Sequence, residues 1–159
     1  MKKLLLLPLL FISFLLQAQN FNIPAYKTKE DYAIHEAQVL QAIEWLRTAP
    51  LSHASRPQAN AYVLKWAEGS PTVSVVVNSY VMGLAEQNPD FLMLWIGGWI
   101  EYALQNKETY SEAEANHQAV KAVIAYYMAG NDVKKDPKLD KLVKQHQKGK
   151  LQAWVAKQY

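Results

Sequence analysis

The fold is decided by one apolar stretch, Phe91-Leu92-Met93-Leu94-Trp95-Ile96-Gly97-Gly98-Trp99-Ile100. Its residues are apolar nearly all round a helix, and a helix of that kind is buried in the core of a protein. An Asn-Pro pair precedes it, so we expect a helix from residue 88 to about 105. The two internal glycines cost about 1 kcal/mol each relative to alanine. We therefore expect them to admit the backbone of a neighbouring helix.

Helix signals recur on both sides of this stretch, each with a capping residue or a proline at its start. These helices are expected over residues 28–49, 57–69 and 111–130, from residue 136 onward, and briefly after residue 149. No segment carries the paired alternating runs and turn residues of a β-hairpin. The starts at Pro57 and Pro89 approach the spacing of helix-pair repeats, but the small residues of a true repeat are missing. We predict an all-α fold of six to seven antiparallel helices, packed as helix-pair layers in a bundle or a short solenoid-like array.

The segment from Val73 to Leu84 is ambiguous between helix and strand. Val73, Val75 and Val77 alternate as they would in a strand, and valine disfavours helices. A longer apolar pattern at helical spacing runs from Val73 through Tyr80 to Leu84. Six matches to a helix over twelve residues outweigh three to a strand over five, so a helix is predicted.

The N-terminus is typical of a cleavable secretory signal. Two lysines follow Met1, an apolar run extends from Leu4 to Leu16, and a small residue, Ala18, stands at the expected cut. The run is shorter than the ~20 residues that a membrane-spanning helix needs. We expect a signal peptide at 1–18 and a single helical domain at 19–159, exported to the periplasm or beyond. An uncleaved N-terminal anchor is the alternative, and the absence of cysteine excludes a lipid-anchored form and disulfides.

Charge is unevenly distributed along the chain. Residues 19–130 carry 7 basic and 11 acidic residues, whereas residues 131–159 carry 8 lysines and 3 aspartates. Lys134, Lys138, Lys141 and Lys148 can share one side of a helix, and such a face attracts anionic lipid headgroups. The alternative is a solvated face docked to the acidic body of the same protein. Nucleic acid is disfavoured, because the region lacks arginine and an aromatic row for stacking bases.

No constellation of catalytic, metal-binding or cofactor-binding residues can be assembled from the sequence. Glu114 and His117 have the spacing of a di-iron carboxylate site, but such a site needs a second pair and two further glutamates. Ser52 and His53 are adjacent, whereas a catalytic triad depends on geometry in space. We therefore expect no metal site and no cofactor, and the chain offers no recognisable active site.

An aromatic row lies along the central helix. Phe91, Trp95, Trp99 and Tyr102 follow one another at spacings of four, four and three residues. Aromatic side chains are the main apolar component of helical cores, which favours core packing. The alternative is a ligand groove at Trp95, Trp99 and Tyr102 that stacks on a sugar or grips an extended peptide.

Two segments carry a resemblance to known proteins: Trp66-Ala67-Glu68-Gly69-Ser70-Pro71-Thr72-Val73 and Gly97-Gly98-Trp99-Ile100-Glu101-Tyr102-Ala103-Leu104. With these segments the chain resembles a group of small exported helical proteins of unknown function from Bacteroidetes-type bacteria. The Ala-Gln junction after the signal is similar to theirs as well. The resemblance covers most of the mature chain, and it implies an envelope location without a known activity.

These observations predict a non-enzymatic binding module of the cell envelope, with a protein or peptide as its partner. Two alternatives stay open: a hydrolytic enzyme without a recognisable motif, and a peripheral protein held at anionic lipid by its basic C-terminal helix.

Overall fold

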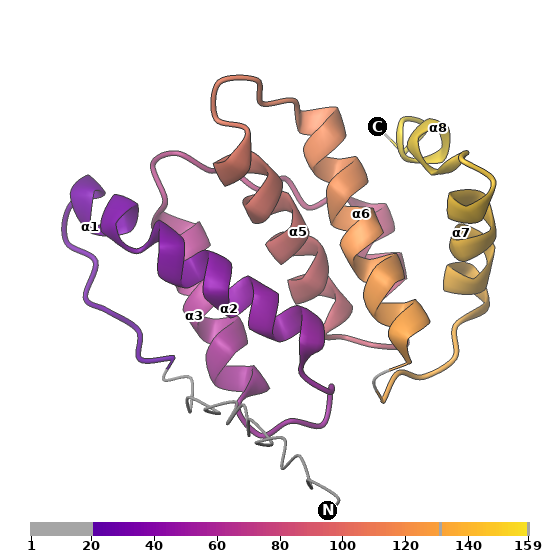
Figure 1. Cartoon of the computed structure of the whole chain (residues 1–159), viewed down its shortest axis with the longest axis horizontal. Helices are drawn as coiled ribbons and strands as arrows, with labels where there is room; N and C mark the ends of the chain where they lie inside the picture. The colour runs from indigo at the N-terminus through magenta and orange to yellow at the C-terminus, as the bar shows by residue number, and fades with distance from the viewer. Residues whose placement is uncertain (1–20, 131, 159) are drawn as a thin grey trace, which may run out of the picture.

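The computed structural model describes residues 21–130 and 132–158, and this part of the chain is all-helical. Its helices are α1 (Lys29–Ile34), α2 (Glu36–Thr48), α3 (Arg56–Gly69), α4 (Ser79–Ala85), α5 (Phe91–Gln105), α6 (Glu112–Ala129), α7 (Pro137–Gln147) and α8 (Leu151–Val155). In Figure 1, α5 and α6 lie side by side in the middle, with α2 and α3 on one side and α7 and α8 on the other. The predicted all-α class is confirmed. The predicted signal at 1–18 lies outside the described residues.

The first predicted helix is interrupted, which raises the number of helices in the described residues above the expected six or seven. The break falls at His35, whose backbone leaves the helical region between α1 and α2. Trp66 of α3 donates its indole N–H to the carbonyl oxygen of Tyr32 at 2.9 Å. This buried tryptophan thus shares a carbonyl of the last turn of α1 with the backbone N–H of His35, which donates to it at 3.2 Å.

The core is built on α5 and α6, which form the most extensive interface among the described helices. Trp95, Trp99 and Ile100 of α5 are fully buried. A Cβ atom at Gly98 would lie 2.9 Å from the Cα atom of Ala119 in α6. The expected approach of a neighbouring backbone is therefore confirmed at Gly98. At Gly97 the nearest neighbour is instead the side chain of Ile43.

The predicted helix over 73–84 is wrong in its first half. Val73 to Asn78 contain no helix, strand, turn or bend, and only α4 is helical. The indole N–H of Trp99 donates to the carbonyl oxygen of Ser74 at 3.1 Å. That bond holds the segment against α5 in an uncoiled form that suits its β-branched valines. Neither of the two readings from sequence, helix or strand, applies to residues 73–78.

A buried arginine joins four elements at one end of the bundle. Arg56 is 1 % exposed, and its Nη1 atom donates to the carbonyl oxygens of Leu46 and Ala49, both at 2.8 Å. Its Nε atom donates to Asp90 at 3.1 Å, and its guanidinium lies 5.4 Å from the ring centre of Tyr126. One side chain thus ties the end of α2 and the starts of α3 and α5 to α6.

The C-terminal helices α7 and α8 pack on α6 through buried leucines and a valine. These residues are Leu139, Leu142, Leu151 and Val155. The side-chain amide of Asn88 forms two hydrogen bonds with the backbone of Lys134, at 2.9 and 2.7 Å, and so ties the connection before α7 to the body. Within the described residues, no helix is long and apolar enough to cross a membrane.

Candidate binding surface

The aromatic row of α5 is part of the core. Trp95 and Trp99 are fully buried, with ring centres 5.0 Å apart. A groove that exposes these two indoles is therefore contradicted, because helices and the segment at Ser74 cover them. Tyr102 is only half-buried and lies at the rim of a surface groove.

That groove runs across α2, α5 and α6. Two adjoining depressions, of about 340 and 330 Å³, share Arg47, Glu101 and Gln118. Arg47 binds Glu101 with both ends of its guanidinium, and the Nη1–Oε1 distance is 2.9 Å. Glu101 is the only carboxylate among the described lining residues, and general acid–base catalysis needs a free group that can exchange a proton. The groove thus offers polar contacts around an ion pair between α2 and α5.

The Glu114–His117 pair predicted from spacing does form. The Glu114 Oε1 atom lies 3.2 Å from His117 Nδ1 and accepts a hydrogen bond from Gln118 at 2.6 Å. Burial opposes ionisation of this carboxyl, but the hydrogen bonds from Gln118 and His117 outweigh it and lower the pKa of Glu114. Its other oxygen accepts from Gln152 at 3.3 Å, so the group links α6 to α8. No cluster of three or more potential metal ligands occurs among the residues that the structure describes.

Ser52 and His53 do not act on one another. Ser52 donates to Asp132 at 2.6 Å, and His53 Nδ1 accepts from the backbone N–H of Ser55 at 3.1 Å. The His53 ring packs edge-on against Trp45. Both side chains therefore hold the loop between α2 and α3 in place: Ser52 binds Asp132, and His53 binds within the loop.

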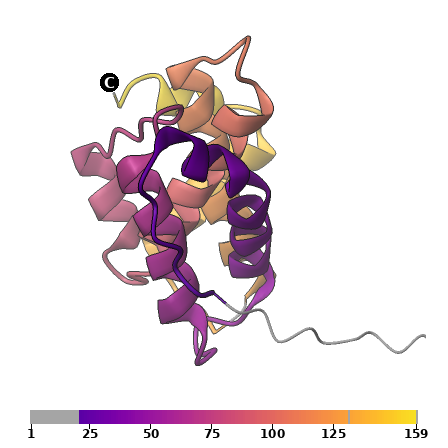
Figure 2. The same ribbon diagram turned by 90° about the vertical axis from the view of Figure 1, so that its left-hand side faces the viewer.

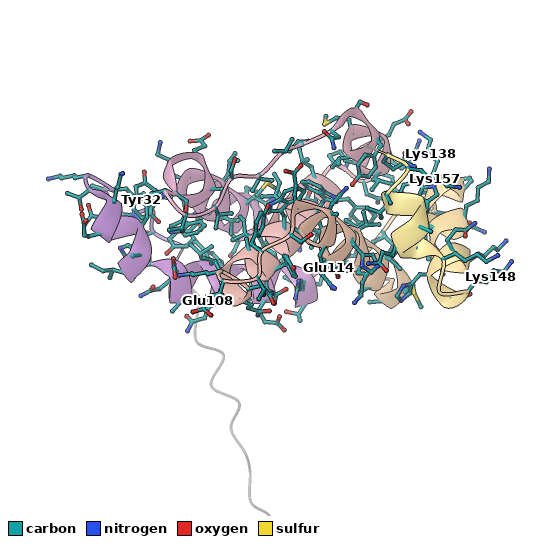
Figure 3. All side chains as sticks on the ribbon, turned by 90° about the horizontal axis from the view of Figure 1, so that it is seen from above. Tyr32, Glu108, Glu114, Lys138, Lys148 and Lys157 are labelled. Carbon is teal, nitrogen blue, oxygen red and sulfur yellow. The ribbon has the colours of Figure 1, made fainter. Side chains whose placement is uncertain are left out.

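The predicted lysines gather at the end of the molecule formed by α7 and α8 (Figure 3). We call this surface the lysine end; it comprises Lys134, Lys135, Lys138, Lys141, Lys144, Lys148, Lys150 and Lys157, all of them exposed. Lys138 pairs with Glu86 of the body, and this hydrogen bond, together with the opposite charges, lowers the pKa of Glu86 and raises that of Lys138. Among the described residues, none of the other seven forms an ion pair.

The three aspartates of the same region face the other way. Asp132 accepts from Ser52, and Asp140 accepts from the hydroxyl of Tyr127 at 2.8 Å. Asp136 is 1 % exposed and caps α7 by accepting from the N–H of Lys138 at 2.7 Å. Two of these carboxylates thus attach this end to the body and the third caps its own helix, while seven of the eight lysines stay in solvent without an ion pair. The sequence predicted the excess of charge but not this separation of the two signs.

Two features of the structure carry no signal in the sequence. Arg47 and Glu101 stand 54 positions apart, and neither belongs to a recognisable pattern. Nothing in the sequence around Arg56 and Pro57 indicates that the arginine is almost fully buried. Only the packing of distant helices creates these contacts.

Comparison with known proteins identifies no family for this chain. No family model matches the chain, and neither a curated protein nor a solved structure matches it. The functional argument therefore depends on the chemistry of the surface alone.

Proposed function

We propose that the chain is an exported, non-enzymatic interaction module of the cell envelope, and that its lysine end binds an anionic lipid surface. One observation carries this proposal: seven exposed lysines without an ion pair share one end of the molecule, while each aspartate beside them is occupied by a hydrogen bond. A surface that gathers one sign of charge attracts the opposite sign over distances of about 10 Å at ordinary salt concentration.

Lysine suits this role better than recognition of a single phosphate. Its ammonium is a compact, mobile point charge, whereas defined phosphate sites favour the planar fork of arginine. Each lysine near an anionic membrane surface contributes about 1 kcal/mol. If three to five of them reach the surface together, the attraction is roughly 3–5 kcal/mol, which supports reversible binding.

The contact should be electrostatic rather than inserted. The large apolar side chains that are exposed in the described part of the chain all lie before residue 129, so none belongs to α7 or α8. Without an apolar wedge, the protein has nothing at this end to bury among acyl chains. Binding should therefore disappear when salt screens the charges.

Sedimentation with lipid vesicles tests the proposal. The purified protein should bind vesicles that contain phosphatidylglycerol, should not bind pure phosphatidylcholine, and should be released by 0.5 M salt. The triple variant Lys141→Gln, Lys144→Gln and Lys148→Gln should lose most of the binding.

A matched control removes the same charge elsewhere. The substitutions Lys27→Gln, Lys29→Gln and Lys65→Gln lie on exposed residues of the opposite side of the chain, and this variant should bind like the wild type. Equal loss in both triple variants, or binding that resists salt, contradicts the proposal. Tighter binding to duplex DNA than to vesicles at the same salt concentration assigns the lysine end to nucleic acid instead.

A further inference from the structure

The stretch Val73–Asn78, which we call the valine segment, contains no helix, strand, turn or bend. It joins α3 to α4 and crosses the outside of the bundle (Figures 1 and 2). Val73 is buried and Ser74 is exposed; Val75 is half-buried and Val76 is 43 % exposed. More and less exposed side chains therefore alternate from Val73 to Val76, as they do in a β-strand at the surface of a protein, and Val77 after them is exposed as well.

The surroundings of the segment are largely apolar, and a cation beside it, Lys107, which lines a depression with Val73 and Ser74, is paired with Glu36 at 2.6 Å. Val76, Val77 and Met82 are 43 %, 44 % and 55 % exposed, and they follow one another closely in the chain. No charged residue occurs from Gly69 to Ala85. A second molecule with the same surface can approach this patch without like-charge repulsion.

The backbone of the segment has one occupied edge and one open edge. In an extended chain, the N–H and C=O groups of alternate residues point to the same edge. The carbonyl of Ser74 accepts from Trp99, so the edge that contains Ser74 and Val76 faces the body. The opposite edge contains Val73, Val75 and Val77. In the described part of the chain, neither a backbone nor a side-chain partner binds the N–H or C=O groups of Val75 and Val77.

We propose that this open edge pairs with the same edge of a second copy of the chain, in an antiparallel two-stranded ribbon centred on Val75. Under a two-fold axis, Val75 exchanges two hydrogen bonds with Val75 of the second copy. The N–H of Val77 donates to the C=O of Val73 in that copy, and the reverse bond completes four. The N–H of Val73 takes no part, because it already donates to Ser70 Oγ at 3.2 Å.

A second copy is the occupant that these groups fit. An open strand edge is complementary to itself in the antiparallel direction, and two such edges form an isologous contact. Cross-strand pairs of β-branched residues add to the stability of such a ribbon. The ribbon joins only the residues from Val73 to Val77 of each copy, whereas a standard interface takes about 20–30 residues from each partner, so we expect weak, reversible dimerisation. A dimer would also present two lysine ends, which increases avidity for a charged surface.

Analytical ultracentrifugation over a series of protein concentrations tests this pairing. The average mass of the wild type should rise toward that of a dimer. Val77→Pro removes one N–H from each side of the ribbon and should keep the protein monomeric at the same concentrations. Val77→Thr keeps the N–H and the branched side chain, and it should dimerise.

A proline one residue earlier provides the sharpest control. Val76→Pro also removes an N–H, but from the edge that faces the body, so dimerisation should persist. Far-UV circular dichroism melts establish that each variant is folded. A wild type that stays monomeric up to about 1 mM overturns the proposal, as does a Val77→Pro variant that dimerises normally.

Amide hydrogen exchange in the wild type supplies a measurement that needs no variant. Protection of the Val75 and Val77 amides should rise with protein concentration, while protection of the Val76 amide should not change. Equal protection at all three positions, or none that depends on concentration, contradicts the register. Binding of an unrelated extended peptide by a protein that remains monomeric assigns the edge to a peptide ligand and overturns pairing between copies.

Discussion

Replacing Gly98 by alanine should destabilise the protein by about 2 kcal/mol. A Cβ atom at this position would lie 2.9 Å from Ala119 Cα, 2.9 Å from Ala122 Cβ and 3.2 Å from the carbonyl oxygen of Gln118. Carbon atoms pack best at about 3.5–4.0 Å. The two central helices would therefore have to separate by roughly 0.6 Å or more at their closest point.

The magnitude follows from two opposing effects. Overpacking a well-filled core costs about 1–3 kcal/mol, and the upper end applies because none of the three contacted atoms can rotate away. Alanine recovers about 1 kcal/mol through its higher helix propensity. The net loss of about 2 kcal/mol should lower the melting temperature by roughly 4–8 °C for a domain of this size.

Gly97→Ala is the matched control in the next position. Its Cβ would lie 3.1 Å from Cγ2 and 3.4 Å from Cγ1 of Ile43, a side chain that can shift by a few tenths of an ångström. The same gain in helix propensity then roughly offsets the strain, and stability should stay within about 1 kcal/mol of the wild type. Urea unfolding, followed by tryptophan fluorescence and circular dichroism, measures both variants. Equal stability of the two variants would refute the close packing of α5 on α6 at Gly98.

Three further predictions concern other parts of the chain. Arg56→Ala should lower the free energy of unfolding in urea by about 3 kcal/mol, because it removes the cation beside Asp90 and one hydrogen bond from each of two buried carbonyls; a loss below about 1 kcal/mol contradicts this role. Folding lowers the pKa of Glu114 from its ordinary value of 4.5. The ionised carboxylate therefore stabilises the fold fully above pH 4.5, and this stabilisation is lost as the pH falls through the lowered pKa. Glu114→Gln should therefore flatten the fall in melting temperature below pH 4.5, and an unchanged profile argues against it. N-terminal sequencing of the exported protein from a bacterial host should begin at or within a few residues of Gln19, and an intact Met1 in the envelope fraction contradicts the predicted signal.

Helix boundaries were predictable where local chemistry sets them. Ser111 caps α6 by accepting from the N–H of Glu114, and Gly130 ends that helix with a φ of 74°. Asp136 caps α7 in the same way, directly before a proline. Capping, proline geometry and the left-handed conformation of glycine depend on a few adjacent residues, so the sequence alone reveals them.

The errors arose where a distant residue overrides local preference. Trp66 donates a hydrogen bond to a carbonyl of α1, and Trp99 donates one to a carbonyl of the valine segment. The periodicity of apolar residues predicts neither contact. The burial of Trp95 and Trp99 was the favoured expectation from the apolar surroundings, and the structure agrees. The exposure of the lysines follows from their spacing, but the inward bonds of Asp132 and Asp140 depend on partners far away in the sequence.

The neighbouring positions of α5 and α6 in the chain bear on how the molecule reaches its native state. The largest interface joins two helices that only the loop at 106–111 separates. Contacts between nearby segments carry a small entropic penalty for loop closure, and they speed the search for the native topology. We therefore expect this helical hairpin to serve as the folding nucleus on which α2 and α3 condense from one side and α7 and α8 from the other. Substitutions within it should slow refolding, whereas substitutions in the outer helices should mainly accelerate unfolding.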